Sequence, residues 1–165
     1  MLITFLRHAT AEVGGLSLPD ADRALIEKGE KQVKRIAAFC LANGLIPESI
    51  YCSPLLRAQQ TARILNQSLP GSPAPQTVSW LAIETATPTI LTELSKLAQR
   101  GISDAWLVGH EPDFSITISR LLGTTPDNIV IKKASLTRLD ADFSAQASAK
   151  LLWSIPCALM RQGQA

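Results

Sequence analysis

The sequence predicts an α/β protein: a three-layer α/β/α sandwich with a mainly parallel sheet and an antiparallel edge strand. Up to residue 123, short apolar runs alternate with helical patterns, which is typical of a parallel sheet covered by helices on both faces. Beyond residue 123, apolar runs follow one another without long helices between them. We therefore expect the last third to add strands at a sheet edge. The length of 165 residues fits a single domain over 1–165.

The strands are predicted from short apolar runs bounded by turn residues. The first run, at residues 2–6, lies near the start of the sequence. A later apolar run, at residues 105–108, precedes a Gly-His pair. The predicted strands lie at residues 2–6, 49–52, 78–81, 105–108, 129–131, 136–139 and 151–155.

The helices are predicted from apolar residues that recur every three or four positions. The first helix carries Val33, Ile36, Ala37, Cys40 and Leu41 on one face and closes at Asn43-Gly44. Each later helix begins at a capping residue or a proline, and glycine ends two of them. The starts are Ser53-Pro54, with Ser53 as the N-cap, Thr87-Pro88 and Glu111-Pro112, and the stops are Gly101 and Gly123.

Composition and charge narrow the class of protein. Apolar residues make up 46% and charged residues 18%, which indicates a folded chain rather than a disordered one. The net charge is only +2 and the cations are scattered, so we expect no nucleic acid and no membrane as partner. Three widely spaced cysteines and a start too short for a signal peptide indicate reduced thiols in a cytoplasmic protein.

The only two histidines each stand directly behind an apolar run. His8 follows residues 2–6 and Arg7, and His110 follows residues 105–108 and Gly109. In α/β proteins, ligands bind beyond the carboxyl ends of the strands, so we expect one site built from both segments. The arginine beside the first histidine suits an anionic substrate, with phosphate the leading candidate.

The residue types at these positions suit phosphoryl transfer. A protein without a metal must neutralise the charge of the phosphoryl oxygens with arginines, and Arg7 and Arg57 are placed to do so. A neutral histidine ring can act as nucleophile, and neighbouring arginines keep His8 unprotonated. His110 can donate a hydrogen bond to a phosphoryl oxygen. Taken singly, each residue has a simpler interpretation as a helix cap, a surface arginine or a structural histidine, but together they favour a site.

Three motifs in this order resemble those of the histidine phosphatase superfamily, which has a phosphoglycerate-mutase-like fold. They are "LRHATAE" at 6–12, "SPLLRAQQTA" at 53–62 and "LVGHEP" at 107–112. The short length and "DRALIEKGEKQ" at 22–32 further resemble SixA-type phosphohistidine phosphatases, whose pattern is Arg-x-Leu-Thr-x-x-Gly. Ile26 stands where that pattern has threonine. The resemblance implies that His8 is the phosphorylated nucleophile, and that Arg7, Arg23, Arg57 and His110 form the phosphate pocket.

A general acid is less clearly marked. Larger superfamily members use a carboxylate to protonate the leaving group, and Glu84 is the positional candidate, with an exposed loop acid as the alternative interpretation. Glu12 and Asp20 are weaker candidates. SixA-type enzymes often lack a clear acid, and the labile P–N bond of phosphohistidine needs one less than an ester does.

The predicted function is a metal-independent phosphatase without cofactors. Two histidines with no pattern of carboxylate ligands make a poor metal set. About thirty residues separate the second motif from the helix at Pro88, which leaves little room for a lid. An open site suits a phosphorylated protein, such as a histidine phosphotransfer domain, as substrate. The alternatives are a broad small-molecule phosphomonoesterase and a noncatalytic phospho-ligand binding module. The oligomeric state is open, with a monomer favoured.

Overall fold

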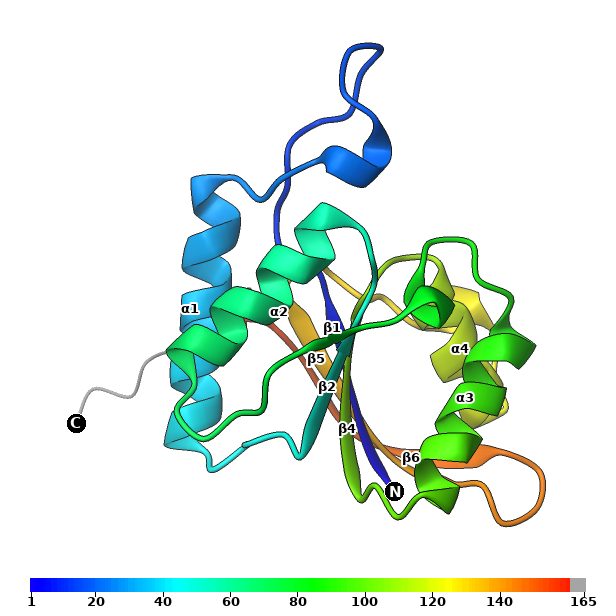
Figure 1. Ribbon diagram of the computed structural model, residues 1–165. Coiled ribbons are helices and arrows are strands. Elements are labelled where there is room, and N and C mark those ends of the chain that lie inside the picture. Colours follow the sequence, from blue (N-terminus) through cyan, green and yellow to red (C-terminus); the bar gives the residue numbers. More distant parts are fainter. Residues whose placement is uncertain (161–165) are drawn as a thin grey trace.

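A six-stranded sheet lies between two pairs of helices in the computed structural model, which describes residues 1–160 (Figure 1). The elements run in the order β1 (Leu2–Arg7), η1 (Asp20–Asp22), α1 (Glu27–Ala42), β2 (Ser49–Cys52), α2 (Leu56–Ser68), β3 (Gln76–Thr77), η2 (Ser79–Leu81), α3 (Thr87–Gln99), β4 (Asp104–Gly109), α4 (Asp113–Leu122), η3 (Pro126–Asn128), β5 (Ser135–Asp142), β6 (Ser148–Pro156) and η4 (Cys157–Leu159), where η marks a short 3-10 turn.

The sheet has the predicted mixture of parallel and antiparallel pairs. Its strand order is β3-β2-β4-β1-β5-β6. The first four of these strands pair in parallel, whereas β5 is antiparallel to β1 and β6 is antiparallel to β5. The predicted fold class is therefore confirmed, with two antiparallel strands at one edge of the sheet.

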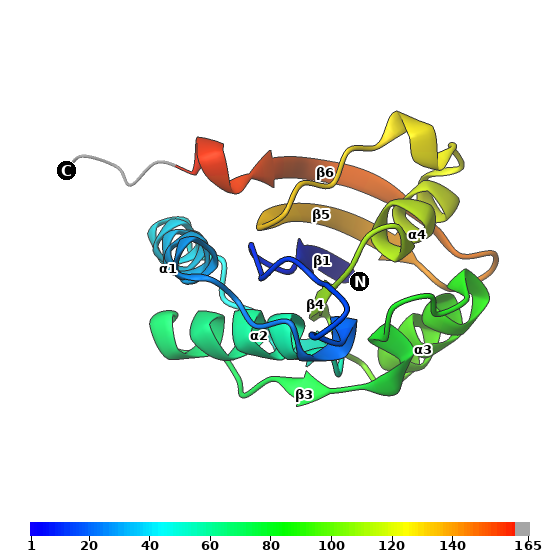
Figure 2. The same ribbon diagram turned by 90° about the horizontal axis from the view of Figure 1, so that it is seen from above.

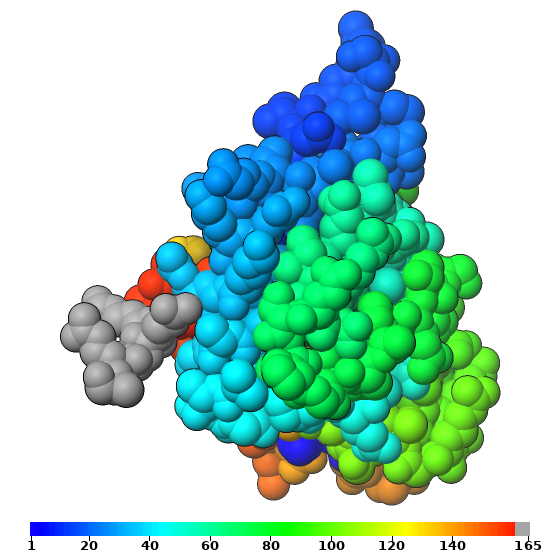
Figure 3. Space-filling model, turned by 60° about the vertical axis from the view of Figure 1, so that its left-hand side comes forward, coloured from blue at the N-terminus to red at the C-terminus, as the bar shows by residue number. Residues whose placement is uncertain are grey.

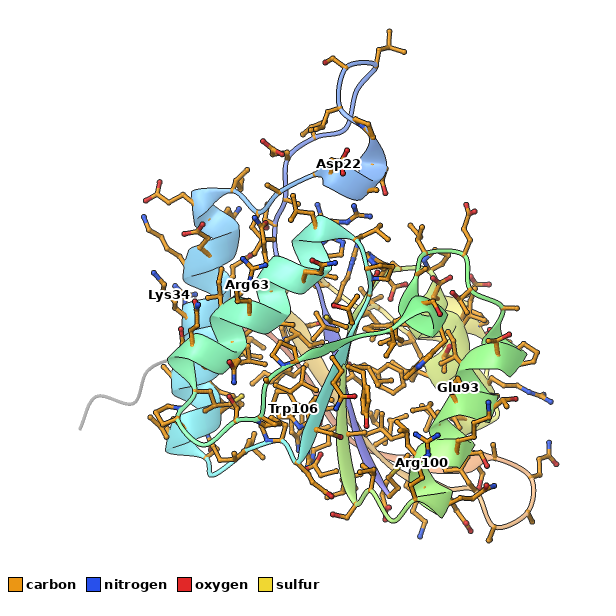
Figure 4. The ribbon with its side chains drawn as sticks, in the orientation of Figure 1. Asp22, Lys34, Arg63, Glu93, Arg100 and Trp106 are labelled. Atoms are coloured by element: carbon orange, nitrogen blue, oxygen red, sulfur yellow. The ribbon has the colours of Figure 1, made fainter. Side chains whose placement is uncertain are left out.

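The helices form two layers, with α1 and α2 on one face of the sheet and α3 and α4 on the other (Figure 2). Successive residues of a strand point to opposite faces, so each central strand feeds two cores. Leu6 and Trp106 belong to the core under α1 and α2, and Phe5 and Leu107 to the core under α3 and α4. Trp106 of β4 is fully buried on the face of the sheet that α1 and α2 cover (Figure 4). No helix within residues 1–160 is long and apolar enough to cross a membrane.

Two predicted strands are wrong: the strand at 78–81 is displaced, and the strand at 129–131 does not form. The pairing of β3 precedes the predicted run at 78–81, most of which forms η2 instead. Only Val78 still donates to the carbonyl of Cys52, and the chain then turns so that Leu81 enters the core. The run at 129–131 forms no strand, because the carbonyl of Ile131 accepts from the Arg7 side chain rather than from a neighbouring strand. In each place one apolar side chain, Leu81 or Ile131, is buried by packing and not by sheet pairing.

The start of α2 also differs from the prediction. The helix begins at Leu56 with Leu55 as its N-cap, so Ser53 is not the cap. Ser53 is fully buried, and its hydroxyl accepts from the backbone N–H of Leu55 at 3.3 Å. This short turn before the helix leaves the hydroxyl facing the candidate site.

A long loop rises from the carboxyl ends of the parallel strands. We call residues 11–25 the projecting loop; it stands clear of the body of the molecule in Figures 1 and 3. Antiparallel bridges between Ala11 and Leu25 and between Gly15 and Leu18 give it the form of an irregular hairpin. Near its tip, the side chains of Val13 and Leu16 are almost wholly exposed.

Candidate active site

The register of two adjacent strands brings the histidines together. Arg7 on β1 pairs with Gly109 on β4, and His8 and His110 follow them directly. The backbone N–H of His8 donates to the carbonyl of Gly109 at 3.0 Å. The two imidazole rings lie 5.2 Å apart between centroids, with their planes inclined at 52°. The prediction that both strand ends contribute to one cluster agrees with this geometry.

Only glycine fits immediately before the second histidine. A Cβ atom on Gly109 would lie 2.7 Å from the ring of Phe114, closer than non-bonded carbon atoms approach. Phe114 is buried in α4 and packs edge-on against Phe5 of β1. The Gly-His pair of the third motif therefore lets α4 pack tightly against β4 while His110 stays at the strand end.

His8 has the protonation state of a nucleophile. Its Nδ1 lies 2.8 Å from the carbonyl oxygen of Ala9, and because that oxygen can only accept, Nδ1 carries the proton. The Nε2 lone pair is then free, and the Nε–H of Arg57 points to it at 3.3 Å. Burial lowers the pKa of His8 to about 4, against a smaller opposing effect of the Ala9 hydrogen bond, and the charges of Arg57 and Arg7 lower it further. The ring is therefore neutral at pH 7.

Arg57 lies in the first turn of α2, as predicted, and only 2% of it is exposed. One edge of its guanidinium faces His8 through Nε, and the terminal nitrogens bind the projecting loop. Nη1 donates to the carbonyl of Asp20 at 2.6 Å, and Nη2 donates to its carboxylate at 2.8 Å. This arginine thus joins the nucleophile to the loop.

His110 is held by the buried serine before α2. Its Nε2 lies 2.6 Å from the Ser53 hydroxyl, which has one proton to donate and also accepts from the N–H of Leu55. When Ser53 donates to Nε2, the proton of His110 lies on Nδ1, which is buried and has no partner among residues 1–160. Burial lowers the pKa of His110 to about 3, with further lowering by His8 and Arg57. The free N–H is suited to a phosphoryl oxygen.

The other two predicted arginines border this cluster. Arg7 is half-buried and donates from Nη1 to the carbonyl of Ile131 at 2.8 Å, and burial lowers its pKa. Arg23, in the projecting loop, donates to the carbonyl of Glu12 and to the carboxylate of Asp20, both at 2.7 Å. Arg23 therefore reaches the cluster through Asp20, which it shares with Arg57.

Two further residues of the second motif tie the site loops together. The hydroxyl of Thr61 donates to the carbonyl of Arg57 at 2.7 Å and accepts from the N–H of Ala9 at 3.1 Å. The Gln60 side chain accepts from the N–H of Leu25 at 2.6 Å. Residue-by-residue reasoning did not assign these roles, although both lie within one helical turn of Arg57.

Lys133 and Glu111 lie near the cluster and were not predicted. Lys133 precedes Ala134, whose N–H donates to the carbonyls of Arg7 and His8, and the lysine's charge helps to lower the pKa of His8. Burial raises the pKa of Glu111, which follows His110 and lies near enough to Arg7 to be stabilised by it. Glu111 belongs to the third motif and adjoins His110 in the sequence, whereas only the fold brings Lys133 here.

Glu84 is not hydrogen-bonded to this network in the part of the chain that the structure describes. It is exposed, and among the described residues its carboxylate makes no hydrogen bond or ion pair with His8, Arg57 or His110. Its backbone has a φ of 65°, and its N–H donates to the carboxylate of Asp113 at 2.9 Å. Its role as general acid therefore stays a prediction.

No metal-binding cluster is evident in the part of the chain that the structure describes. Within residues 1–160, no group of three or more histidine, cysteine, aspartate or glutamate residues is placed to hold a metal ion. The cysteines at 40, 52 and 157 are free and buried, and burial raises the pKa of all three thiols.

Sequence comparison identifies the family. Residues 3–81 match the family described as "Histidine phosphatase superfamily (branch 1)". An uncharacterized protein of Picosynechococcus sp. is 35% identical over 140 residues, covering 84% of each chain. An uncharacterized chloroplastic protein of Arabidopsis thaliana is 27% identical over 130 residues, covering 74% of this chain and 60% of the relative. The chain belongs to the histidine phosphatase superfamily.

Solved structures with the same fold include several phosphatases. The protein histidine phosphatase SixA complexed with tungstate superposes with a TM-score of 0.87 at 20% identity, covering 98% of this chain and 100% of that one. A putative SixA from Agrobacterium tumefaciens gives 0.78 at 22% identity over 93% and 96%. A putative alpha-ribazole-5'-P phosphatase from Escherichia coli gives 0.71 at 18% identity over 92% and 94%. The fold is that of SixA, and family and fold together support phosphatase activity.

Proposed function

We propose that the protein is a metal-independent phosphatase that hydrolyses phosphohistidine on a protein through a covalent intermediate on His8. The observation that carries the proposal is the Nε2 atom of His8, an unprotonated ring nitrogen faced by the Nε–H of Arg57 at 3.3 Å. A neutral nucleophile beside a fixed cation is what attack on a phosphoryl group requires.

In the first step, the Nε2 lone pair of His8 attacks phosphorus. A new N–P bond forms as the P–N bond to the substrate imidazole breaks, and the departing nitrogen takes up a proton from solvent water. The phosphorylated ring becomes cationic, and its Nδ1–H stays bonded to the carbonyl of Ala9. Arg57, Arg7 and the Nδ1–H of His110 neutralise the phosphoryl oxygens, an effect worth about 10²–10³-fold per well-placed donor.

In the second step, water attacks the phosphorus atom held on His8. The N–P bond breaks, its electron pair returns to Nε2, and inorganic phosphate leaves. The low pKa of His8 supports this step, because the ring is released in its neutral form and is ready for another cycle.

Proton donation to the leaving group separates substrate classes. The P–N bond of phosphohistidine is labile, so imidazole departs with little acid catalysis. An alkoxide is a poorer leaving group and needs an acid to protonate it. Glu84 is the candidate for such an acid. Its backbone adopts the left-handed conformation, which is costly for glutamate, and a hydrogen bond from its N–H to Asp113 holds it there. Such strain is often found at functional positions. Within residues 1–160 the Glu84 carboxylate makes no hydrogen bond with the histidine network, which favours a substrate that does not need it.

The surroundings of the site favour a protein over a small metabolite. The projecting loop stands beside the arginines and presents Val13 and Leu16 to solvent. Exposed apolar side chains on a loop that also binds Arg57 are suited to contact the body of a macromolecular substrate, such as a histidine phosphotransfer domain. A small-molecule phosphomonoesterase is the second candidate, since one protein of the same fold is described as a putative alpha-ribazole-5'-P phosphatase.

The test is phosphate release from a phosphohistidine-bearing phosphotransfer domain in EDTA, comparing wild type with His8→Ala. Release that vanishes in the variant, together with an acid-labile phosphoryl label on wild-type protein, is the expected result. Full activity in His8→Ala, or loss of wild-type activity in EDTA, would overturn the mechanism. A parallel reaction with p-nitrophenyl phosphate distinguishes the substrate classes: release from the ester alone indicates a small-molecule phosphatase. Phosphate-sensitive binding without release indicates a binding module.

A further inference from the structure

We propose that Asp20 is a positioning residue that holds Arg57 and Arg23 in the phosphate site and so couples the projecting loop to catalysis. The inference rests on the proposed function for the substrate that these arginines receive. It concerns the arrangement of the site before any substrate is bound.

The carboxylate of Asp20 bridges the two arginines. One oxygen accepts from Nη1 of Arg23 at 2.7 Å, and the other accepts from Nη2 of Arg57 at 2.8 Å. The backbone carbonyl of Asp20 accepts from Nη1 of Arg57 at 2.6 Å. A single residue therefore binds both terminal nitrogens of Arg57 and aligns Arg23 with them.

The edge of Arg57 that Asp20 occupies is the important detail. A guanidinium group can offer one edge made by its two terminal nitrogens and another made by Nε and one terminal nitrogen. Asp20 takes the first edge, while Nε points to Nε2 of His8 at 3.3 Å. A phosphoryl group on that Nε2 would meet the second edge of Arg57 without displacing Asp20. The aspartate thus orients the arginine and does not compete with the substrate.

The three residues come from two parts of the fold. Arg57 is buried in α2, whereas Asp20 and Arg23 belong to the projecting loop, and the Asp20 side chain is 52% exposed. Contact of a protein substrate with the loop would therefore reach Arg57 through this one bridge. The pKa of Asp20 is lowered chiefly by its hydrogen bond with Arg23, so the residue stays ionised at neutral pH and is a fixed anion, not a proton donor.

The direct test follows the Nε–H of Arg57 by NMR, in wild type, Asp20→Ala, Asp20→Asn and Asp22→Asn. The signal is assigned by its loss in Arg57→Lys. Asp22 is the matched control, since it lies in the same 3-10 turn and, within residues 1–160, makes no ion pair with either arginine (Figure 4). We expect a sharp, protected signal in wild type and Asp22→Asn, and a shifted, broadened one in Asp20→Ala. An unchanged signal in Asp20→Ala would overturn the proposal, whatever reaction the protein catalyses.

Kinetics supply the second readout. With p-nitrophenyl phosphate, we expect Asp20→Ala to lower kcat at least about tenfold and to change KM much less. The reason is that a misplaced arginine reduces stabilisation of the transition state more than it reduces substrate binding. Asp20→Asn, which keeps the acceptor oxygen, should fall between Asp20→Ala and wild type. If Asp20 instead competed with substrate, both variants would bind inorganic phosphate more tightly by calorimetry, and that result would refute the positioning role. The calorimetric test needs no turnover, so it remains decisive if the proposed function fails.

Discussion

The Nε–H of Arg57 points at the unprotonated Nε2 of His8 across 3.3 Å. The contact joins a buried cation to the atom that we propose attacks phosphorus, and it exists only while the imidazole is neutral. Protonation of His8 would place two positive charges at hydrogen-bond distance within the protein interior. The electrostatics of the site thus depend on the state of this ring.

Both histidine rings should remain neutral well below the usual titration range of histidine. Burial lowers the pKa of His8 to about 4 and that of His110 to about 3, so acid removes the nucleophilic lone pair only as the pH falls through about 4. Nitrogen-resolved NMR at pH 6 should show the His8 proton on Nδ1 and none on Nε2, with His110→Ala assigning the signals. The unfolded chain binds these protons near pH 6.5, so the free energy of unfolding should decrease as the pH falls below that value. A His8 titration near pH 6.5 would contradict the assignment.

Arg57→Ala should lower kcat for phosphate release by about 10²–10³-fold, because it removes a buried donor at the developing phosphoryl charge. Arg57→Lys should recover little of that loss, since an ammonium group cannot bind Asp20 and the phosphoryl group with two edges. Arg63→Ala provides the control on the exposed side of the same helix (Figure 4) and should leave kcat unchanged. Equal effects of the two alanine variants would show that general helix damage is being measured.

Glu84→Gln should separate ester hydrolysis from phosphohistidine hydrolysis. If this carboxyl donates a proton to the leaving group, its loss should lower kcat for an alkyl phosphate by up to about 10²-fold. The decrease in kcat for p-nitrophenyl phosphate should be smaller. Release from phosphohistidine should change little. Glu111→Gln is the comparison, because Glu111 directly follows His110 and burial raises its pKa. An alkyl phosphatase activity that only Glu111→Gln impairs would transfer the role to that residue.

Replacing Val13 and Leu16 together by serine should impair only the reaction with a protein. The two side chains are almost wholly exposed, so their replacement should not alter the melting temperature. We expect KM for a phosphorylated phosphotransfer domain to rise about tenfold, the equivalent of 1.4 kcal/mol of lost contact, with kinetics on p-nitrophenyl phosphate unchanged. Leu159→Ser, another exposed apolar position but after β6, is the control. Equal losses with both substrates would point to a disturbed site and not to lost docking.

Ile26→Thr should stabilise the protein. Ile26 is the N-cap of α1, its backbone is extended, and it provides no side-chain cap. A threonine hydroxyl there can accept from an unpaired N–H of the first turn, which is worth about 1 kcal/mol in the free energy of unfolding. Urea denaturation should show a higher midpoint with an unchanged slope. Ile26→Val has the same branched shape without the oxygen, and an equal gain in that variant would rule out capping.

The central part of the fold follows from the sequence because the parallel strands are continuous apolar runs. Residues 2–6 and 105–108 are flanked by turn residues and by the two histidines, so both the strands and their shared edge could be predicted. The segment at 129–131 misled because Ile131 is buried without sheet pairing, while Val130 is largely exposed. Periodicity reports burial, and it does not distinguish a strand from a packed loop.

The polar contacts within the site were less predictable. Ser53 has the sequence context of a helix cap, yet its hydroxyl binds His110 from another strand. Asp20 was considered only as a weak acid, because nothing near it in the sequence shows that Arg57, 37 positions away, binds its carboxylate. Such roles depend on how distant segments meet in the fold, and a single sequence carries no local signal for them.

The parallel pairing of Arg7 with Gly109 has a consequence for how the site can vary. His8 and His110 leave neighbouring strands at the same level, and adjacent strands lie about 4.8 Å apart, close to the 5.2 Å between the rings. The spacing of the two histidine rings is therefore set by the backbone of the sheet. Insertions in the surrounding loops can change what approaches the two histidines while the distance between them stays constant.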